Sequence, residues 1–229
     1  SLYGADPRYV INAIFNAEQA AVLYPDWEAR FYIDNTVPDS IVERLKSFDN
    51  AKVINMTFEY TPDFRGLAHS PKMLWRFYAY DDPQVSRVIF RDTDSYLMKR
   101  EADAVNQWCT TDRALHLMRE VQPGHRSKIM GGMWGLKKSS KFKSFVKLLR
   151  EKSTINWTPT DQNFLNDWVY PLFDPEDRVV HDADNAFNDT THEWPSPRDG
   201  DMFVGRTQGP PCIESGYLER YEKLRLELL

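Results

Sequence analysis

The sequence predicts an α/β protein, with a mostly parallel central sheet flanked by helices in a single domain over residues 1–229. The first observation is size and composition: 229 residues, 41% of them hydrophobic and 14% aromatic, suit one buried core. The second is that apolar, β-branched segments alternate with amphipathic helical segments through the first half. Strands joined by connections of helical length form parallel sheets.

The first half supplies a strand, helix, strand unit and its neighbours. Apolar residues recur at helical spacing before Pro25, and the short runs ARFYIDN and AKVINM enclose the helical pattern PDSIVERLKSFD. The expected elements are a helix over 7–24, a strand over 29–35, a helix over 38–49, a strand over 51–56, a helical segment over 66–83 and a strand over 86–90.

The second half is less regular. A strand-like RALHLMRE precedes the glycine-rich KIMGGMWGLKK, and a basic helical pattern follows. The stretch 182–211 is rich in Asp, Pro, Thr, Gly and Asn and predicts an irregular loop or lid. The expected elements are a strand over 113–120, helices over 139–152 and 158–171, a strand over 178–182 and a final helix over 216–229.

Charge and cysteine content exclude several classes of protein. A formal charge of −5 and a pI near 5.6 argue against binding nucleic acid through its phosphates, and no apolar run approaches the roughly 20 residues of a membrane span. Cys109 and Cys212 lie far apart and indicate neither a zinc site nor a disulfide framework, so we expect a reducing, cytoplasmic location. Ser1 in place of an initiating Met suggests a processed, trimmed or excised chain.

Two aspartates one residue apart follow the expected strand over 86–90. In an extended strand, residues i and i+2 share a face, so Asp92 and Asp94 would project together. Carboxylate pairs of this kind, completed by a diphosphate and water, hold Mg²⁺. The alternative is that Asp-Thr-Asp-Ser is simply a turn, because Asp and Ser favour turns.

Further candidate ligand-binding residues lie on either side of this pair. Lys72 and Arg76 have i, i+4 spacing, which suits either a grip on a diphosphate or a solvated basic edge. Gly131 and Gly132 remove side-chain bulk and would allow close approach by a hexose. Trp134 would stack on the apolar face of that sugar, or else belong to the core.

The motifs SLYG, YPDW, RFYID, WRF, RDTDS, GGMWG and TDQNFLN occur in this order between Ser1 and Pro171, with a weaker FVG near Phe203. The set resembles nucleotide-sugar glycosyltransferases with the GT-A fold, a Rossmann-like sheet flanked by helices. The likeness is strongest to the group found in polysaccharide loci and in large DNA viruses, such as the chlorella viruses, that glycosylate their own capsids.

The resemblance implies transfer of a hexose from a nucleoside diphosphate sugar, with UDP favoured, to a saccharide or glycoprotein acceptor. It implies Mn²⁺ or Mg²⁺ at Asp92 and Asp94, with His181, at the end of a later strand, as a third ligand or as hydrogen-bonded structure. Arg91 would help to hold phosphate or else pair with a carboxylate. Asp161 would be the base of an inverting reaction, or only the N-cap of its helix.

One departure from the family pattern concerns the start of the chain. Proteins of this group usually have a strand immediately before the SLYG turn, whereas here the sequence begins at that turn. Two other functions stay open. A haloacid-dehalogenase-type phosphatase also uses Asp-x-Asp and Mg²⁺, but usually near its first residues, and a carbohydrate-binding module would stack aromatic residues on sugars without catalysis.

Overall fold

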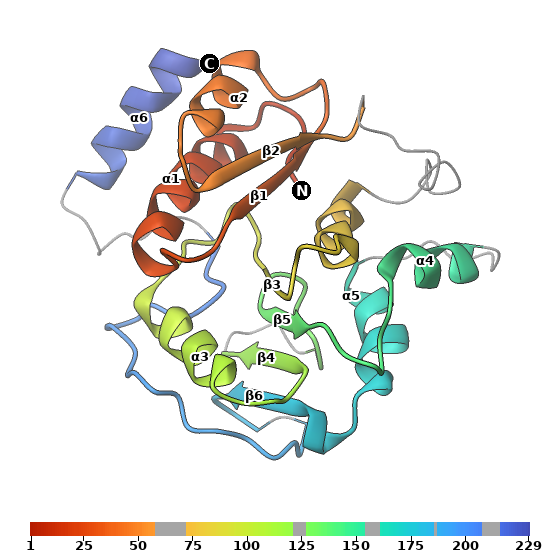
Figure 1. Cartoon of the computed structure of the whole chain (residues 1–229). Helices are drawn as coiled ribbons and strands as arrows, with labels where there is room; N and C mark the ends of the chain where they lie inside the picture. Colours follow the sequence, from red (N-terminus) through yellow and green to blue (C-terminus); the bar gives the residue numbers. More distant parts are fainter. Residues whose placement is uncertain (58–71, 121–126, 154–160, 186, 208–215) are drawn as a thin grey trace.

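The computed structural model describes residues 1–57, 72–120, 127–153, 161–185, 187–207 and 216–229, and they form a mixed α/β protein with two small sheets (Figure 1). The first sheet has the order β1-β2 and the second the order β3-β5-β4-β6. The expected helices over 66–83 and 158–171 begin in segments outside the described residues. Cys212 also lies outside the described residues.

The N-terminal part is the strand, helix, strand unit that the sequence predicts. Its elements are α1 (Pro7–Leu23), β1 (Ala29–Ile33), α2 (Asp39–Lys46) and β2 (Ala51–Asn55). The two strands pair in parallel, from Ala29 opposite Ala51 to Ile33 opposite Asn55. Helix α1 begins after Asp6, whose carboxylate accepts a hydrogen bond from the Arg8 amide and so caps the helix.

The second sheet departs from the expected parallel arrangement. Strand β3 (Arg87–Phe90) pairs antiparallel with β5 (Trp134–Lys137), which pairs antiparallel with β4 (Leu115–Arg119). Only β4 and β6 (Arg178–Asp182) are parallel. The sequence analysis noted this segment only for its glycines and did not predict β5. A single mostly parallel sheet is therefore not what these residues form.

Helices lie against both sheets (Figure 1). Helix α6 (Tyr217–Leu228) lies against α1, where the Tyr217 hydroxyl donates to Asn12 at 2.7 Å. The other helical elements are the 3₁₀ helix η2 (Lys72–Asp81), α3 (Lys99–Cys109), α4 (Phe145–Ser153), α5 (Asp161–Phe164), the π-helical turn η3 (Leu165–Val169) and the 3₁₀ turns η4 (Tyr170–Leu172) and η5 (Pro175–Asp177). Helix α3 was not predicted.

The largest core cluster is aromatic and lies between η2, the second sheet, α4 and α5. Phe90 and Trp134 have ring centroids 4.3 Å apart, and Phe77 contacts both edge to face. Burial of such side chains is the main favourable term in folding. Within the described part of the chain, no helix combines the length and the apolar character that crossing a membrane requires.

Candidate functional site

A tight turn after β3 presents the two aspartates. The Ser95 amide donates to the Asp92 carbonyl at 3.3 Å, and the Asn16 side-chain amide donates to the carbonyls of Thr93 and Ser95 at 3.2 and 2.9 Å. The strand has ended at Phe90, so the strand alternation that predicted a shared face does not apply. Asp92 and Asp94 nevertheless line the same two cavities, because the turn brings both toward one cleft.

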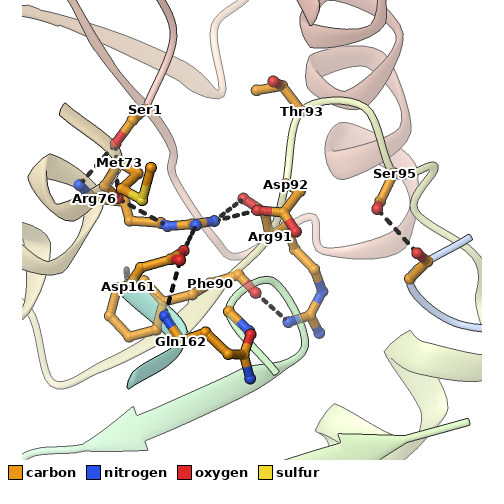
Figure 2. A network of polar contacts seen from close by, with 12 residues as sticks. Ser1, Met73, Arg76, Phe90, Arg91, Asp92, Thr93, Ser95, Asp161 and Gln162 are labelled. Carbon is orange, nitrogen blue, oxygen red and sulfur yellow. Dashed lines mark hydrogen bonds and ion pairs between the residues drawn. The ribbon is translucent and has the colours of Figure 1, made fainter. Parts of the chain in front are cut away.

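Arg76 joins the turn to a helix that is distant in sequence. Its guanidinium contacts an Asp92 oxygen at 2.5 Å and an Asp161 oxygen at 2.6 Å (Figure 2). The backbone carbonyls of Met73 and Arg91 accept further hydrogen bonds from it at 3.2 and 3.3 Å. One cation is thereby held between two carboxylates, at the junction of η2, the β3 turn and α5.

The pKa values of the two aspartates of the turn are shifted in opposite directions. Burial alone would raise the pKa of Asp92, but the adjacent Arg76 charge and hydrogen bond outweigh it and hold the pKa below its usual value. Burial, and then the negative charge of Asp92, raise the pKa of Asp94, which Arg8 only partly offsets from 3.8 Å away. Asp94 is thus the carboxylate with the least cationic compensation.

Two of the cavities that adjoin this acidic cluster are lined by more than one of its carboxylates. One of about 370 Å³ lies between the aspartates and the N-terminal segment, and its wall includes Tyr3, Tyr9 and Met73. The other, of about 330 Å³, lies on the glycine side and includes Gly131 and Gly132. Both are lined by Asp92, Asp94 and Asp161. The carboxylates therefore stand where the two cavities meet.

The two glycines permit a close approach to the carboxylates. A Cβ on Gly131 would lie 2.8 Å from an Asp161 oxygen, and one on Gly132 would lie 2.8 Å from the Asp92 backbone nitrogen and overlap its carboxylate. Real Cβ atoms do not approach so closely, so any side chain here would push the acidic groups away. The sequence reading assigned these glycines to sugar access; the structure shows them against the aspartates.

Side chains of α5 and η3 bind the backbone of residues 128–132, the glycine segment. The sequence analysis did not identify these side chains. Gln162 accepts a hydrogen bond from the Gly131 amide at 3.2 Å and donates to the Ile129 carbonyl. Asn166 accepts from the Lys128 amide at 2.9 Å. The i, i+4 spacing of Gln162 and Asn166 within TDQNFLN was the signal that could have identified them.

Two predicted donor-binding residues have other partners. Lys72 contacts Asp34 at 2.5 Å and lines neither of the two cavities. It does not share the face of Arg76, because residues spaced i, i+4 diverge on a 3₁₀ helix with three residues per turn. Arg91 points away from Asp92 (Figure 2) and donates to Glu101 at 2.8 Å, which is the alternative role of pairing with a carboxylate.

Trp134 and His181 are also placed elsewhere. Trp134 is 0% exposed in the aromatic core, so the core alternative holds and stacking on a sugar does not. His181 is likewise buried, with Nδ1 2.9 Å from His116 Nε2 and Nε2 2.7 Å from the Gln107 side chain. Both of its ring nitrogens are engaged, and it lines neither cavity at the aspartates. It is not a third ligand there.

The donor set at the turn fits a hard divalent cation held by few protein ligands. Asp92 and Asp94 offer oxygen atoms, and the pKa of Asp94 is raised first by burial and then by the negative charge of Asp92, both of which a bound cation would offset. No cluster of three or more His, Cys, Asp or Glu residues suited to a metal occurs in the part of the chain that is described. Phosphate and water oxygens would complete the coordination, as is usual for Mg²⁺.

Comparison with known proteins yields no assignment: no protein-family model matches the chain, and no curated protein matches it. The site's function therefore has to be argued from its own geometry.

Proposed function

We propose that this protein is a metal-dependent glycosyltransferase that moves a hexose from a nucleoside diphosphate sugar, most simply a UDP-sugar, to a hydroxyl of a saccharide or glycoprotein acceptor. The observation that carries the proposal is the convergence of Asp92, Asp94, Arg76 and Asp161 at the meeting point of two cavities. The resemblance of the sequence motifs to those of GT-A glycosyltransferases and the open cleft at the aspartates support the same function.

Asp92 and Asp94 would hold the cation through their carboxylate oxygens. Mn²⁺ or Mg²⁺ bound there supplies charge neutralisation for a diphosphate oxygen that becomes negative as it leaves the sugar. Arg76 is a second cationic group beside the same cleft and would contact the diphosphate directly. Its present contacts with Asp92 and Asp161 are ones that a phosphate oxygen can replace.

Two cavities that meet at the aspartates suit a reaction between two substrates. The nucleotide would occupy the cavity lined by Tyr3 and Tyr9, and the sugar and acceptor the glycine side. The anomeric carbon then loses its bond to the diphosphate oxygen and gains one to the acceptor oxygen. The acceptor proton passes to Asp161, whose carboxylate lines both cavities.

The first test is cation-dependent binding of UDP, measured by calorimetry with Mn²⁺ and then with EDTA. We expect affinity to fall at least tenfold in EDTA, and Asp94→Asn to cause a similar loss with Mn²⁺ present. Asp112→Asn is the matched control, because Asp112 is fully exposed and its ion pair among the described residues is with Lys137, across 3.3 Å. Equal UDP affinity with and without Mn²⁺ would contradict the metal role.

The second test is turnover with a panel of UDP- and GDP-sugars. Product that contains a new glycosidic bond separates a transferase from a binding module, and release of inorganic phosphate from a sugar phosphate would instead indicate a phosphatase. Absence of any transfer or donor hydrolysis despite metal-dependent UDP binding would overturn the catalytic part of the proposal.

A further inference from the structure

Asn16 is a buried polar side chain in the middle of helix α1. It is 8% exposed, and its neighbours Ile14, Phe15 and Ala17 are buried apolar residues. Asparagine is a poor helix former, and a buried amide group is costly unless its donors and its acceptor all have partners. The partners of Asn16 therefore show what this residue does in the fold.

In the described chain, the hydrogen bonds of the Asn16 side chain lead to the turn after β3, 77 to 81 residues further along the sequence. Its Nδ2 donates to the carbonyls of Thr93 and Ser95 at 3.2 and 2.9 Å, and its Oδ1 accepts from the Leu97 amide at 3.3 Å. Figure 2 shows this turn beside α1. One side chain thus uses both its donor hydrogens and its acceptor on three backbone groups of the turn.

The bond to the Thr93 carbonyl fixes the orientation of the next residue, Asp94. In a trans peptide group the C=O and N–H bonds point in opposite directions. The Thr93 carbonyl points toward Asn16, so the Asp94 N–H points away from it. That N–H is hydrogen-bonded to the Asp94 carboxylate. The carboxylate that lines the two cavities is therefore held on the side of the turn opposite to Asn16.

The other contacts of the turn act on different groups. Arg76 contacts the Asp92 carboxylate, and the Ser95 hydroxyl donates to the Gly205 carbonyl at 3.3 Å. Ser95 also forms an antiparallel bridge with Thr207. The two aspartates are thus held by different elements, Asp92 by η2 and Asp94 through its peptide group by α1.

We propose that Asn16 is a positioning residue for the candidate metal site, because it holds the turn in the conformation that presents the Asp94 carboxylate to the cation. Groups that bind a metal ligand from behind in this way determine the orientation of the ligand. Without Asn16 the peptide group between Thr93 and Asp94 can rotate, and the Asp94 carboxylate turns with it. The role of the cation in this inference rests on the proposed function.

The test compares Asn16→Ala and Asn16→Leu with the control variants Asn12→Ala and Asn12→Leu. Asn12 lies one helical turn earlier, is 7% exposed and accepts a hydrogen bond from the Tyr217 hydroxyl at 2.7 Å, so it is a buried asparagine that does not bind the turn. Leucine is branched like asparagine and fills its place without making hydrogen bonds. A loss shared by the alanine and leucine variants is therefore not due to a cavity.

The first measurement is uptake of Mn²⁺ in the presence of UDP, followed by EPR. We expect the Mn²⁺ affinity to fall by about 10- to 100-fold in both Asn16 variants and to stay within a few-fold of wild type in both Asn12 variants. Turnover at saturating Mn²⁺ should fall less than the Mn²⁺ affinity, because additional cation compensates for a poorly held ligand. The second measurement, amide hydrogen exchange without metal, should show faster exchange over 93–97 in the Asn16 variants only.

The outcomes separate this inference from the proposed function. If the wild-type chain takes up Mn²⁺ with UDP and the Asn16 variants do so with equal affinity, or if the Asn12 variants lose as much, the positioning role is wrong. If the wild-type chain takes up no Mn²⁺, the metal-dependent function is wrong, and hydrogen exchange over 93–97 then decides whether Asn16 holds the turn.

A third measurement needs no variant, so the inference stays testable if the Asn16 variants do not fold. Cation binding and the Asn16 contacts stabilise the same conformation of the turn, and such coupling is reciprocal. We therefore expect Mn²⁺ with UDP to slow hydrogen exchange of the Leu97 amide in the wild-type chain. Unchanged exchange of this amide when Mn²⁺ and UDP are bound would overturn the positioning role.

Discussion

Arg76 determines how the three carboxylates of the site differ. It contacts Asp92 and Asp161 but not Asp94, so the pKa of Asp92 is lowered while burial and the charge of Asp92 raise that of Asp94. The charged form of a carboxylate is destabilised when the group is partly removed from water and lies beside a second carboxylate. Asp94 therefore gains most from a bound cation, which is why its substitution is the chosen test of metal binding.

Replacing Gly132 with alanine should damage the site through sterics alone. The new Cβ would overlap the Asp92 carboxylate and lie 2.8 Å from the Asp92 backbone nitrogen, so the turn would have to move. We expect at least a tenfold loss of Mn²⁺-dependent UDP affinity by calorimetry. Gly200→Ala is the control for backbone strain without a steric clash, because alanine is disfavoured at its φ of +56° but nothing lies within 4 Å of the added Cβ. Equal affinities in the two variants would contradict the close-packing argument.

Asp161→Asn tests the proposed base. Asparagine keeps the shape and can still accept the hydrogen bond from the Gln162 amide, which is 2.9 Å in the native chain. We expect UDP affinity within a few-fold of wild type and turnover lower by roughly 10²- to 10⁴-fold, the usual weight of general-base catalysis.

The product's anomeric configuration, determined by NMR, completes the test of Asp161. Undiminished turnover in Asp161→Asn, or retention of configuration in the wild-type product, would leave Asp161 as a structural partner of Arg76.

At the scale of elements, the start of α5 and the turn η3 act as a clamp on the glycine segment. Gln162 and Asn166 together contact the backbone of Lys128, Ile129 and Gly131. Asp161 belongs to the same helix, so the clamp sets the distance between the proposed base and the two glycines. Backbone groups held by side chains in this way keep a loop in one conformation.

Gln162→Ala should loosen that clamp without touching a charge. The hydrogen bonds of the Gln162 side chain with the Gly131 amide and the Ile129 carbonyl are lost, which costs about 1 to 3 kcal/mol where buried groups lose their partners. We expect turnover to fall more than UDP affinity, because the glycine side is where the sugar would react. Gln162→Glu keeps the acceptor for the Gly131 amide and should be intermediate. Identical kinetics for Gln162→Ala and wild type would rule out a positioning role.

At the scale of the whole molecule, a buried histidine group links the second sheet to α3. His116 on β4 and His181 on β6 contact each other, and Gln107 of α3 binds the second nitrogen of His181. Burial, followed by the neighbouring His192 and Arg100, lowers the pKa of His181 to about 4. Burial and then His181 lower the pKa of His116 well below its ordinary value.

These shifts predict loss of stability in mild acid. A histidine whose pKa is lower in the folded state than its unfolded value of about 6.5 stabilises the fold above pH 6.5, and this contribution declines as pH falls toward the folded pKa. For His181 alone the free energy of unfolding should fall by about 2 kcal/mol between pH 7 and pH 5.

Urea unfolding at pH 7, 6 and 5 measures the effect, in a range where ordinary carboxylates stay ionised. In His181→Gln the free energy of unfolding should fall less steeply between pH 7 and pH 5, even if it is lower than in the wild type at pH 7. A decline of equal slope in His181→Gln would show that other groups are responsible.

The sequence by itself determined where most elements lie. The strands β1, β2, β3, β4 and β6 and the helices α1, α2, α4 and α6 lie where their periodicity predicted them. Such patterns are local, because burial of one face of a helix or strand is written into neighbouring residues. The sequence also identified Asp92, Asp94, Asp161 and the two glycines, which the structure brings together.

Only the tertiary structure decided how these elements combine. Strand pairing depends on contacts between distant residues, so the split into two sheets and the antiparallel β5 could not be seen in local patterns. The roles of individual side chains follow from desolvation and from partners far along the chain. Arg76 contacts two carboxylates, whereas Arg91 pairs with Glu101 and His181 with His116. Each of these side chains has such a partner because a polar or charged group removed from water is costly unless it is hydrogen-bonded or paired.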